Sequence, residues 1–190
     1  MTQPEPITRA SQLWKQMTDS QRARAAEAFW KEGQAGAEHA EVVGLLSRRL
    51  NFRVKSVLAL PLERKVKYTA GLAGVSDGVA GRLLIAYHLA HQRPMMAQFL
   101  DALAIPHEDG LIDDEVQPTV DAEKVPAAAR SLFADHPVED VRLYLATLLL
   151  QDPGTWGVLA TAVDEARAAT ADVAQPQDEA RPQAPPTDQA

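Results

Sequence analysis

The chain contains no cysteine, which excludes disulfide bonds, thiolate metal ligands and a cysteine nucleophile. Aromatic residues make up only 5% of it, and β-branched residues are sparse beside alanine and leucine, a balance that favours helices over sheets. No apolar run approaches the roughly 18 to 20 residues that span a bilayer. The N-terminus also lacks the basic start and apolar run of a signal peptide. We therefore expect a soluble cytoplasmic protein that does not enter a membrane.

What is present indicates one helical domain. Hydrophobic residues form 46% of the 190-residue chain, a normal globular fraction, and this length suits a single core. We predict a flexible leader at 1–8, an all-α globular domain at 9–172 and a disordered tail at 173–190. The tail is rich in proline, glutamine and alanine and has too few large apolar side chains to fold. The domain is expected to be a single compact body of about seven to nine helices.

Capping and helix-breaking residues set the expected helix limits. Thr18 and Gln21 have the spacing of a capping box, which predicts a helix from Asp19 to about Lys31. Ser76 is expected to cap a helix over 77–92, and Pro94 to open the next one. Other helices are expected over 37–50, 62–73, 126–134, 138–150 and 155–169. The apolar residues around position 58 are expected to lie in the core: Val54, Val57, Leu58, Leu60 and Leu62.

Charge is segregated along the chain. Residues 48–67 carry seven basic groups against Glu63 alone, a local charge of +6, while residues 101–140 carry eleven acidic groups against two basic ones, a local charge of −9. The basic groups can pair with the acidic ones or simply be solvated. They can also form a patch that binds an acidic protein surface or a phosphate backbone, with Phe52 stacking on a base. The net charge of −7 opposes nonspecific nucleic-acid binding, so nucleic acid is the second alternative.

Residues 106–120 predict an acidic connector between helices. The segment His107-Glu108-Asp109-Gly110 lacks the alternating oxygen ligands of a calcium-binding loop. An ordinary solvated turn, with Gly110 at positive φ, explains it better. Leu111 and Ile112 are expected to point inward.

Three histidines offer a metal or ligand site as the first alternative function. His88 and His91 are three residues apart and would share a helix face, where they could bind zinc or iron with His107 and Asp109. The helical zinc-protease motif and the paired Glu-x-x-His motif of di-iron proteins are both absent. The simpler interpretation makes His88 a core residue bonded to a carbonyl or carboxylate, with His91 and His107 at helix ends.

No motif for catalysis or nucleotide binding reaches useful specificity, because the glycines at 71–81 lack the phosphate-loop pattern and no serine has a nucleophile-elbow context. We therefore predict a non-catalytic helical module, without a cofactor, that binds a protein partner, for which an acidic surface would fit. Phe29 and Trp30 are adjacent and cannot both face one core line. Trp30 is therefore expected either to be partly exposed, as interface anchors are, or to be covered by an N-terminal helix. The predicted partner-binding residues are Trp30, Arg48, Arg49, Arg53 and Lys55. Oligomeric state stays open, since the apolar C-terminal helices can close a monomer core or form a dimer face.

Overall fold

The structure, a computed structural model, describes residues 8–33, 36–113, 115 and 117–161. These residues include the ten helices named next and no β-strand, which confirms the all-α prediction. The helices are α1 (Ala10–Gln16), α2 (Asp19–Lys31), α3 (Ala37–Leu50), α4 (Val54–Leu58), α5 (Leu62–Ala70), α6 (Asp77–His91), α7 (Arg93–Ala102), α8 (Val125–Asp135), α9 (Val138–Gln151) and α10 (Pro153–Trp156). The tail predicted at 173–190 and nearly all of the predicted leader lie outside the described residues.

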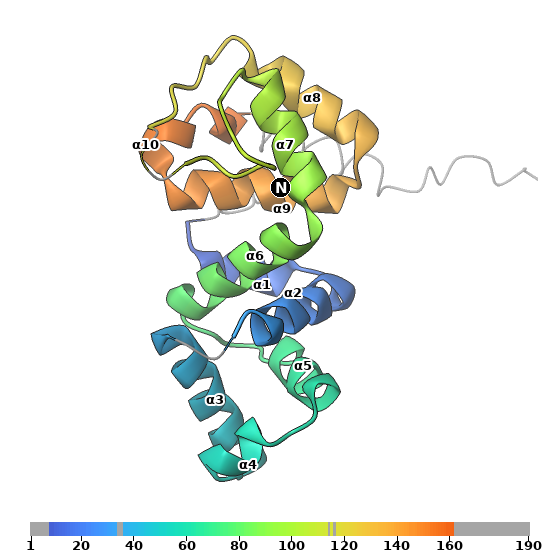
Figure 1. The fold of residues 1–190 in the computed structure, drawn as a ribbon, viewed down its shortest axis with the longest axis vertical. Helices are drawn as coiled ribbons and strands as arrows, with labels where there is room; N and C mark the ends of the chain where they lie inside the picture. The colour runs from blue at the N-terminus through green and yellow to red at the C-terminus, as the bar shows by residue number, and fades with distance from the viewer. Residues whose placement is uncertain (1–7, 34–35, 114, 116, 162–190) are drawn as a thin grey trace, which may run out of the picture.

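The helices surround two clusters of buried side chains. Helices α1, α2, α3 and α6 supply most of the first cluster, and α7, α8, α9 and α10 supply most of the second. Figure 1 shows the two groups stacked along the long axis of the molecule, with α6 crossing the middle. Helix α9 belongs to both clusters, because Leu143 packs in the first and Leu145 in the second. The body is therefore elongated, and its two cores share a helix.

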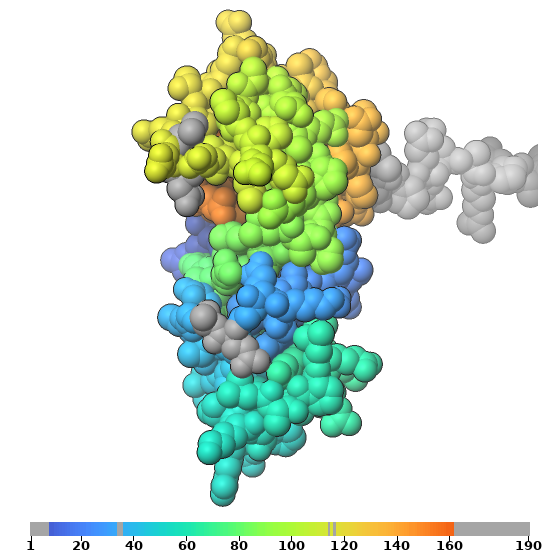
Figure 2. Space-filling model, in the orientation of Figure 1, coloured from blue at the N-terminus to red at the C-terminus, as the bar shows by residue number. Residues whose placement is uncertain are grey.

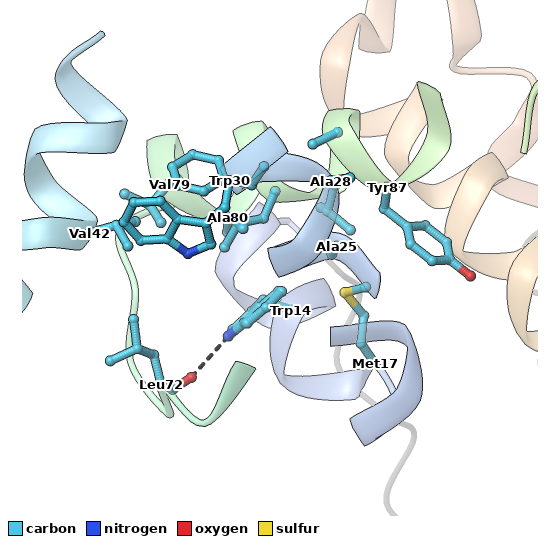
Figure 3. Packing of buried hydrophobic residues seen from close by; sticks show 14 of the residues in the cluster. Trp14, Met17, Ala25, Ala28, Trp30, Val42, Leu72, Val79, Ala80 and Tyr87 are labelled. Atoms are coloured by element: carbon cyan, nitrogen blue, oxygen red, sulfur yellow. Dashed lines mark hydrogen bonds between the residues drawn. The ribbon is translucent and has the colours of Figure 1, made fainter. Parts of the chain in front are cut away.

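Two tryptophans anchor the first core (Figure 3). Trp14 is fully buried, and its indole N–H donates to the carbonyl of Leu72 at 2.9 Å. Trp30 lies close to Val42 of α3 and Val79 of α6. Each indole thus joins an N-terminal helix to a segment far along the chain.

A partly buried polar network joins α2, α6 and α9 where the two cores meet. The Tyr87 hydroxyl donates to Oδ1 of Asp140 at 2.6 Å, and Nε2 of Gln21 donates to the same oxygen at 2.8 Å. Nε2 of Gln92 donates to the Tyr87 hydroxyl oxygen at 3.1 Å. Figure 3 shows the Tyr87 ring pointing away from the tryptophans. Burial is the main cause that raises the pKa of Tyr87 to about 12, and the bond to Asp140 adds to it.

Local signals placed most helix starts correctly. Thr18 and Gln21 form the predicted capping box, and the Ser76 hydroxyl accepts from the backbone N–H of Val79. Pro94 lies in the first turn of α7. The sequence missed α4, a five-residue helix with no side-chain cap at its start.

The predicted burial of residues 54–62 needs correction. Val57 is buried and Leu58 and Leu60 are half-buried, but Val54 and Leu62 are 50% and 39% exposed. Val54 and Leu62 are the first residues of the short helices α4 and α5, and the described residues leave both side chains exposed. Across the described part of the chain, no helix is both long and apolar enough to cross a membrane.

Candidate protein-binding surface

A tight corner between α3 and α4 positions exposed apolar and basic side chains. Asn51 ends α3 in the left-handed conformation, with φ of 52°. The backbone N–H of Phe52 then donates to the carbonyl of Ser47 at 3.0 Å, which closes the last turn of the helix. Asparagine tolerates this conformation better than most residues because its short polar side chain can bond locally. The corner fixes where Phe52 and the start of α4 lie.

Three large apolar side chains are exposed at this corner and at the starts of α4 and α5. Phe52 is 43% exposed, Val54 is 50% exposed and Leu62 is 39% exposed. They come from the α3–α4 corner, the start of α4 and the start of α5. Helices α3, α4 and α5 lie together at one end of the long axis (Figures 1 and 2). An apolar group of this kind is a typical contact surface for another macromolecule.

Four cations lie close in sequence to these apolar side chains, on or beside α3, α4 and α5: Arg48, Arg53, Lys55 and Arg64. All four are exposed, and none forms an ion pair with a carboxylate in the part of the chain that the structure describes. Glu63 is the single acidic residue between positions 48 and 67. We call the exposed side chains of Arg48, Phe52, Arg53, Val54, Lys55, Leu62 and Arg64 the basic end. Within the described ranges, no carboxylate of the acidic segment pairs with these charges, which are exposed to solvent.

Two other cations of the basic segment contribute to packing instead. The guanidinium of Arg49 donates to the carbonyl of Gly71, which links the end of α3 to the end of α5. Lys65 is buried, and its ammonium lies 5.1 Å from the centre of the Trp30 ring. A cation over an indole face is attracted by the negative face of the ring. Three of the predicted binding residues therefore lie on the basic end without an ion-pair partner among the described residues: Arg48, Arg53 and Lys55. The guanidinium of Arg49 is instead bonded to a backbone carbonyl.

Trp30 does not provide the exposed anchor that the sequence suggested. Its side chain is 6% exposed, and its indole N–H donates to the hydroxyl of Thr69 on α5 at 3.0 Å. Helix α2 is covered by α5 as well as by α6. Phe29 stacks on His39 of α3 with ring centres 5.6 Å apart, while Trp30 meets Lys65 and Thr69 of α5. Two adjacent aromatic residues can both be buried because α2 has neighbours on more than one side.

His88 is a buried core residue. Its Nε2 lies 3.1 Å from the hydroxyl of Thr147 on α9, and its Nδ1 is buried without a partner among the described residues. Its ring packs edge-on against Tyr87 and Tyr144. Burial lowers the pKa of His88 to about 4, so the imidazole is neutral at pH 7. The core interpretation was right about burial, although the partner is a hydroxyl rather than a carbonyl or carboxylate.

The other two histidines have separate surroundings. His91 is half-buried near Arg24 and Glu27 of α2, and burial lowers its pKa. His107 lies in the α7–α8 connector, where Nδ1 accepts from the backbone N–H of Gly110 and Nε2 lies 3.1 Å from Asp101. In the described ranges no three histidine or carboxylate side chains come together in a way that could hold a metal ion. The structure therefore does not assemble the set His88, His91, His107 and Asp109.

Asp109 instead stabilises the acidic connector. It lies at φ of 49°, its carboxylate is 3.3 Å from the guanidinium of Arg93, and Gly110 follows it with the predicted positive φ. Ile112 is half-buried against the second core, but Leu111 is 38% exposed and does not point inward as expected. Glu108 and Leu111 form an isolated bridge that closes this turn.

Sequence reasoning missed Val54 and Leu62 as surface residues and missed the Tyr87–Asp140 network. Apolar character alone does not distinguish an exposed valine or leucine from a buried one. The sequence therefore held no signal that Val54 and Leu62 are exposed. Tyr87 and Asp140 lie 53 positions apart, and no local pattern indicates that contact. Comparisons with models of protein families, with curated proteins and with solved structures find no match for this chain.

Proposed function

We propose that this protein is a non-catalytic, cytoplasmic interaction module whose basic end binds an acidic segment of a protein partner. The observation that carries the proposal is the presence of Phe52, Val54 and Leu62, each well exposed, among four cations without ion-pair partners in the described ranges. Apolar side chains at the centre of an interface supply affinity, and the charges around them select an oppositely charged partner.

Several features favour a protein partner over nucleic acid. Phosphate contacts need cations, whereas Val54 and Leu62 gain nothing from a phosphate backbone and a great deal from apolar side chains. Only Phe52 offers a ring on which a base could stack. The net charge of −7 also repels a polyanion at long range, while it has less effect on a short acidic segment.

Site-specific photo-crosslinking in the native host tests the proposal. A photoreactive phenylalanine analogue in place of Phe52 is expected to give discrete adducts whose crosslinked peptides are acidic and contain apolar residues. Val158 is the matched control position, because it is 41% exposed and apolar but lies outside the basic end. The double variant Arg48→Glu/Arg53→Glu should reduce the yield of these adducts by about tenfold, since reversed charges repel an acidic partner.

Three results would contradict the proposal. Adducts equal in identity and yield at positions 52 and 158 would show only general stickiness. Adducts from position 52 that survive the double charge reversal would exclude charge-guided recognition. Crosslinks to nucleic acid, with affinity for labelled DNA that falls steeply as salt rises, would support the nucleic-acid alternative instead.

A further inference from the structure

The two halves of the molecule carry opposite charge. Residues 8–91 contain 13 basic and 7 acidic residues, whereas residues 92–161 contain 4 basic and 12 acidic residues. The basic end lies at the extremity of the first half, and the α7–α8 connector lies in the other half (Figures 1 and 2). One copy of the chain therefore presents two distant surfaces of opposite sign.

The acidic half also has a hollow with apolar parts. A pocket of about 860 Å³ lies along the α7–α8 connector. Its apolar lining comes from Pro106, Leu111 and Ile112, its acidic lining from Glu108, Asp109 and Asp113, and Arg93 and His107 complete it. Glu108 and Asp113 are exposed, and neither forms an ion pair with a described cation. The pocket thus combines unpaired negative charge with accessible apolar surface.

The connector holds this pocket in a defined shape. Gly110 is buried, with φ of +80°, and a Cβ built on it would lie 2.8 Å from Cβ of Met96 and 2.9 Å from the carbonyl oxygen of Arg93. The turn therefore sits directly on α7. The guanidinium of Arg93 reaches back to the carbonyl and carboxylate of Asp109. A pocket wall fixed in this way can accept a protruding group without first being ordered.

We infer that the partner of the basic end includes a second copy of this chain, whose α7–α8 pocket receives the corner formed by Phe52, Arg53, Val54 and Lys55. This inference rests on the proposed function and names one partner for the same surface. Phe52 and Val54 would contact Leu111 and Ile112 of the other copy, while Arg53 and Lys55 would face its Glu108 and Asp113. The surfaces agree in both charge and apolar character.

The predicted contact is head-to-tail. The surface used on one copy differs from the surface used on the next. In a pair of copies, the one that contributes its basic end keeps a free pocket, and the other keeps a free basic end. Repetition gives a ring if the rotation closes and an open chain if it does not. Contacts between two acidic halves are disfavoured because residues 92–161 carry 12 acidic and only 4 basic residues, which leaves the basic end as the attractive side for another copy.

Sedimentation velocity on the full chain at low ionic strength, over a range of concentrations, tests the inference. The wild type should associate reversibly, and added salt should weaken association. Arg53→Glu/Lys55→Glu and Glu108→Lys/Asp113→Lys should each weaken it at least tenfold, because like charges then meet. A mixture of the two variants should associate again, since the native corner of one meets the native pocket of the other. Lys15→Glu/Arg130→Glu is the matched control, because it changes the net charge as much as Arg53→Glu/Lys55→Glu does, at exposed positions outside both surfaces. The control variant should associate more strongly than Arg53→Glu/Lys55→Glu.

Isotope-labelled chains give a second readout. In a mixture of ¹⁵N-labelled and unlabelled protein, a photoreactive group at position 52 should crosslink to residues 106–113 of the other copy. A monomer at every concentration, or association that persists in both charge-reversed variants, overturns the inference. If such a monomer still gives charge-dependent adducts with a different acidic protein, the proposed function stands and only self-recognition fails. If neither kind of contact occurs, both proposals fail.

Discussion

At the scale of single residues, His88 makes stability depend on pH. Its pKa is about 4 in the folded protein, against 6.5 for an unperturbed histidine. The unfolded chain therefore binds a proton at a higher pH than the folded chain does, and the free energy of unfolding falls as pH drops from about 6.5 to about 4. The loss attributable to His88 is on the order of 3 kcal/mol. Above pH 6.5 the contribution of His88 is constant.

Urea unfolding at pH 7.5, 5.5 and 4.5 measures this effect. The variant His88→Gln removes the titrating ring and retains a polar side chain at this position. Its free energy of unfolding should decline less steeply with acid than that of the wild type. The pKa values of His39 and His91 are also lowered, so the difference between the two proteins is the quantity that isolates His88. Equal slopes would contradict the assignment.

The sequence predicted single residues well where one helix face decides the outcome. His88 lies in the apolar run of α6, and its burial followed from that run. Trp30 was misplaced because its burial depends on α5, whose Thr69 is 39 positions away. Arg49 and Lys65 were counted as part of one basic segment, yet contacts with Gly71 and Trp30 take them into the packing. Tertiary partners, absent from any local pattern, decide such cases.

At the scale of the helical elements, Asn51 sets the corner on which the basic end depends. Its φ of 52° disfavours residues with a Cβ that lack a compensating bond. Asn51→Ala should lower the free energy of unfolding by about 1 kcal/mol, whereas Asn51→Gly should have little effect. Thermal or urea unfolding of the two variants gives the comparison. A glycine variant as unstable as the alanine variant would show that the asparagine side chain, rather than the backbone conformation, is what matters.

Gly110 has the same role for the connector. Gly110→Ala places a methyl group against Met96 and the α7 backbone at positive φ, so it should cost more than about 1 kcal/mol and loosen the turn. Gly74→Ala is the matched control, because nothing lies within 4 Å of its Cβ position and its φ is not positive. Hydrogen exchange of residues 106–113 should accelerate in the first variant alone. Unchanged protection would mean that the turn is not held by its contact with α7.

Helix starts were predictable where a side chain caps the backbone, as at Thr18 and Ser76. Helix α4 was not, because five residues with no side-chain cap give no periodicity to read. The missed helix belongs to the candidate surface, and its outward residue Val54 was therefore assigned to the core. Short uncapped helices owe their existence to packing, in this case against α3.

At the scale of the whole molecule, the shared helix α9 should make the two cores unfold together. Trp14 and Trp30 report on the first core and Trp156 on the second. The variant Trp156→Phe reports on the first core and the variant Trp14→Phe/Trp30→Phe on the second. Their urea transitions, followed by fluorescence, should therefore coincide once each midpoint is corrected for the effect of its own substitutions on stability. Adding Asp140→Ala and Thr147→Val removes the polar links of α9 to α2 and α6 and should separate the midpoints. Transitions already separate without those changes would show that the halves fold independently.

The all-α class and the excess charge of each segment could be predicted from composition and order along the chain. The arrangement of the charged segments could not, because the sequence does not say that α4 and the α7–α8 connector belong to different halves. That arrangement depends on the abrupt change of direction at Gln92, between α6 and α7, where φ is −123°. A continuous helix there would have carried the second half elsewhere.

The separation of charge along the long axis gives the molecule a permanent electric dipole. A uniformly acidic protein with a pI near 5.2 should flow through a cation-exchange column at neutral pH. This protein should instead be retained weakly by cation exchangers as well as anion exchangers, because each resin meets a different extremity first. Anionic matrices would hold it by the corner at Phe52, with the acidic half directed into solution. Orientation near a charged surface is thus a property of the fold that net charge alone does not describe.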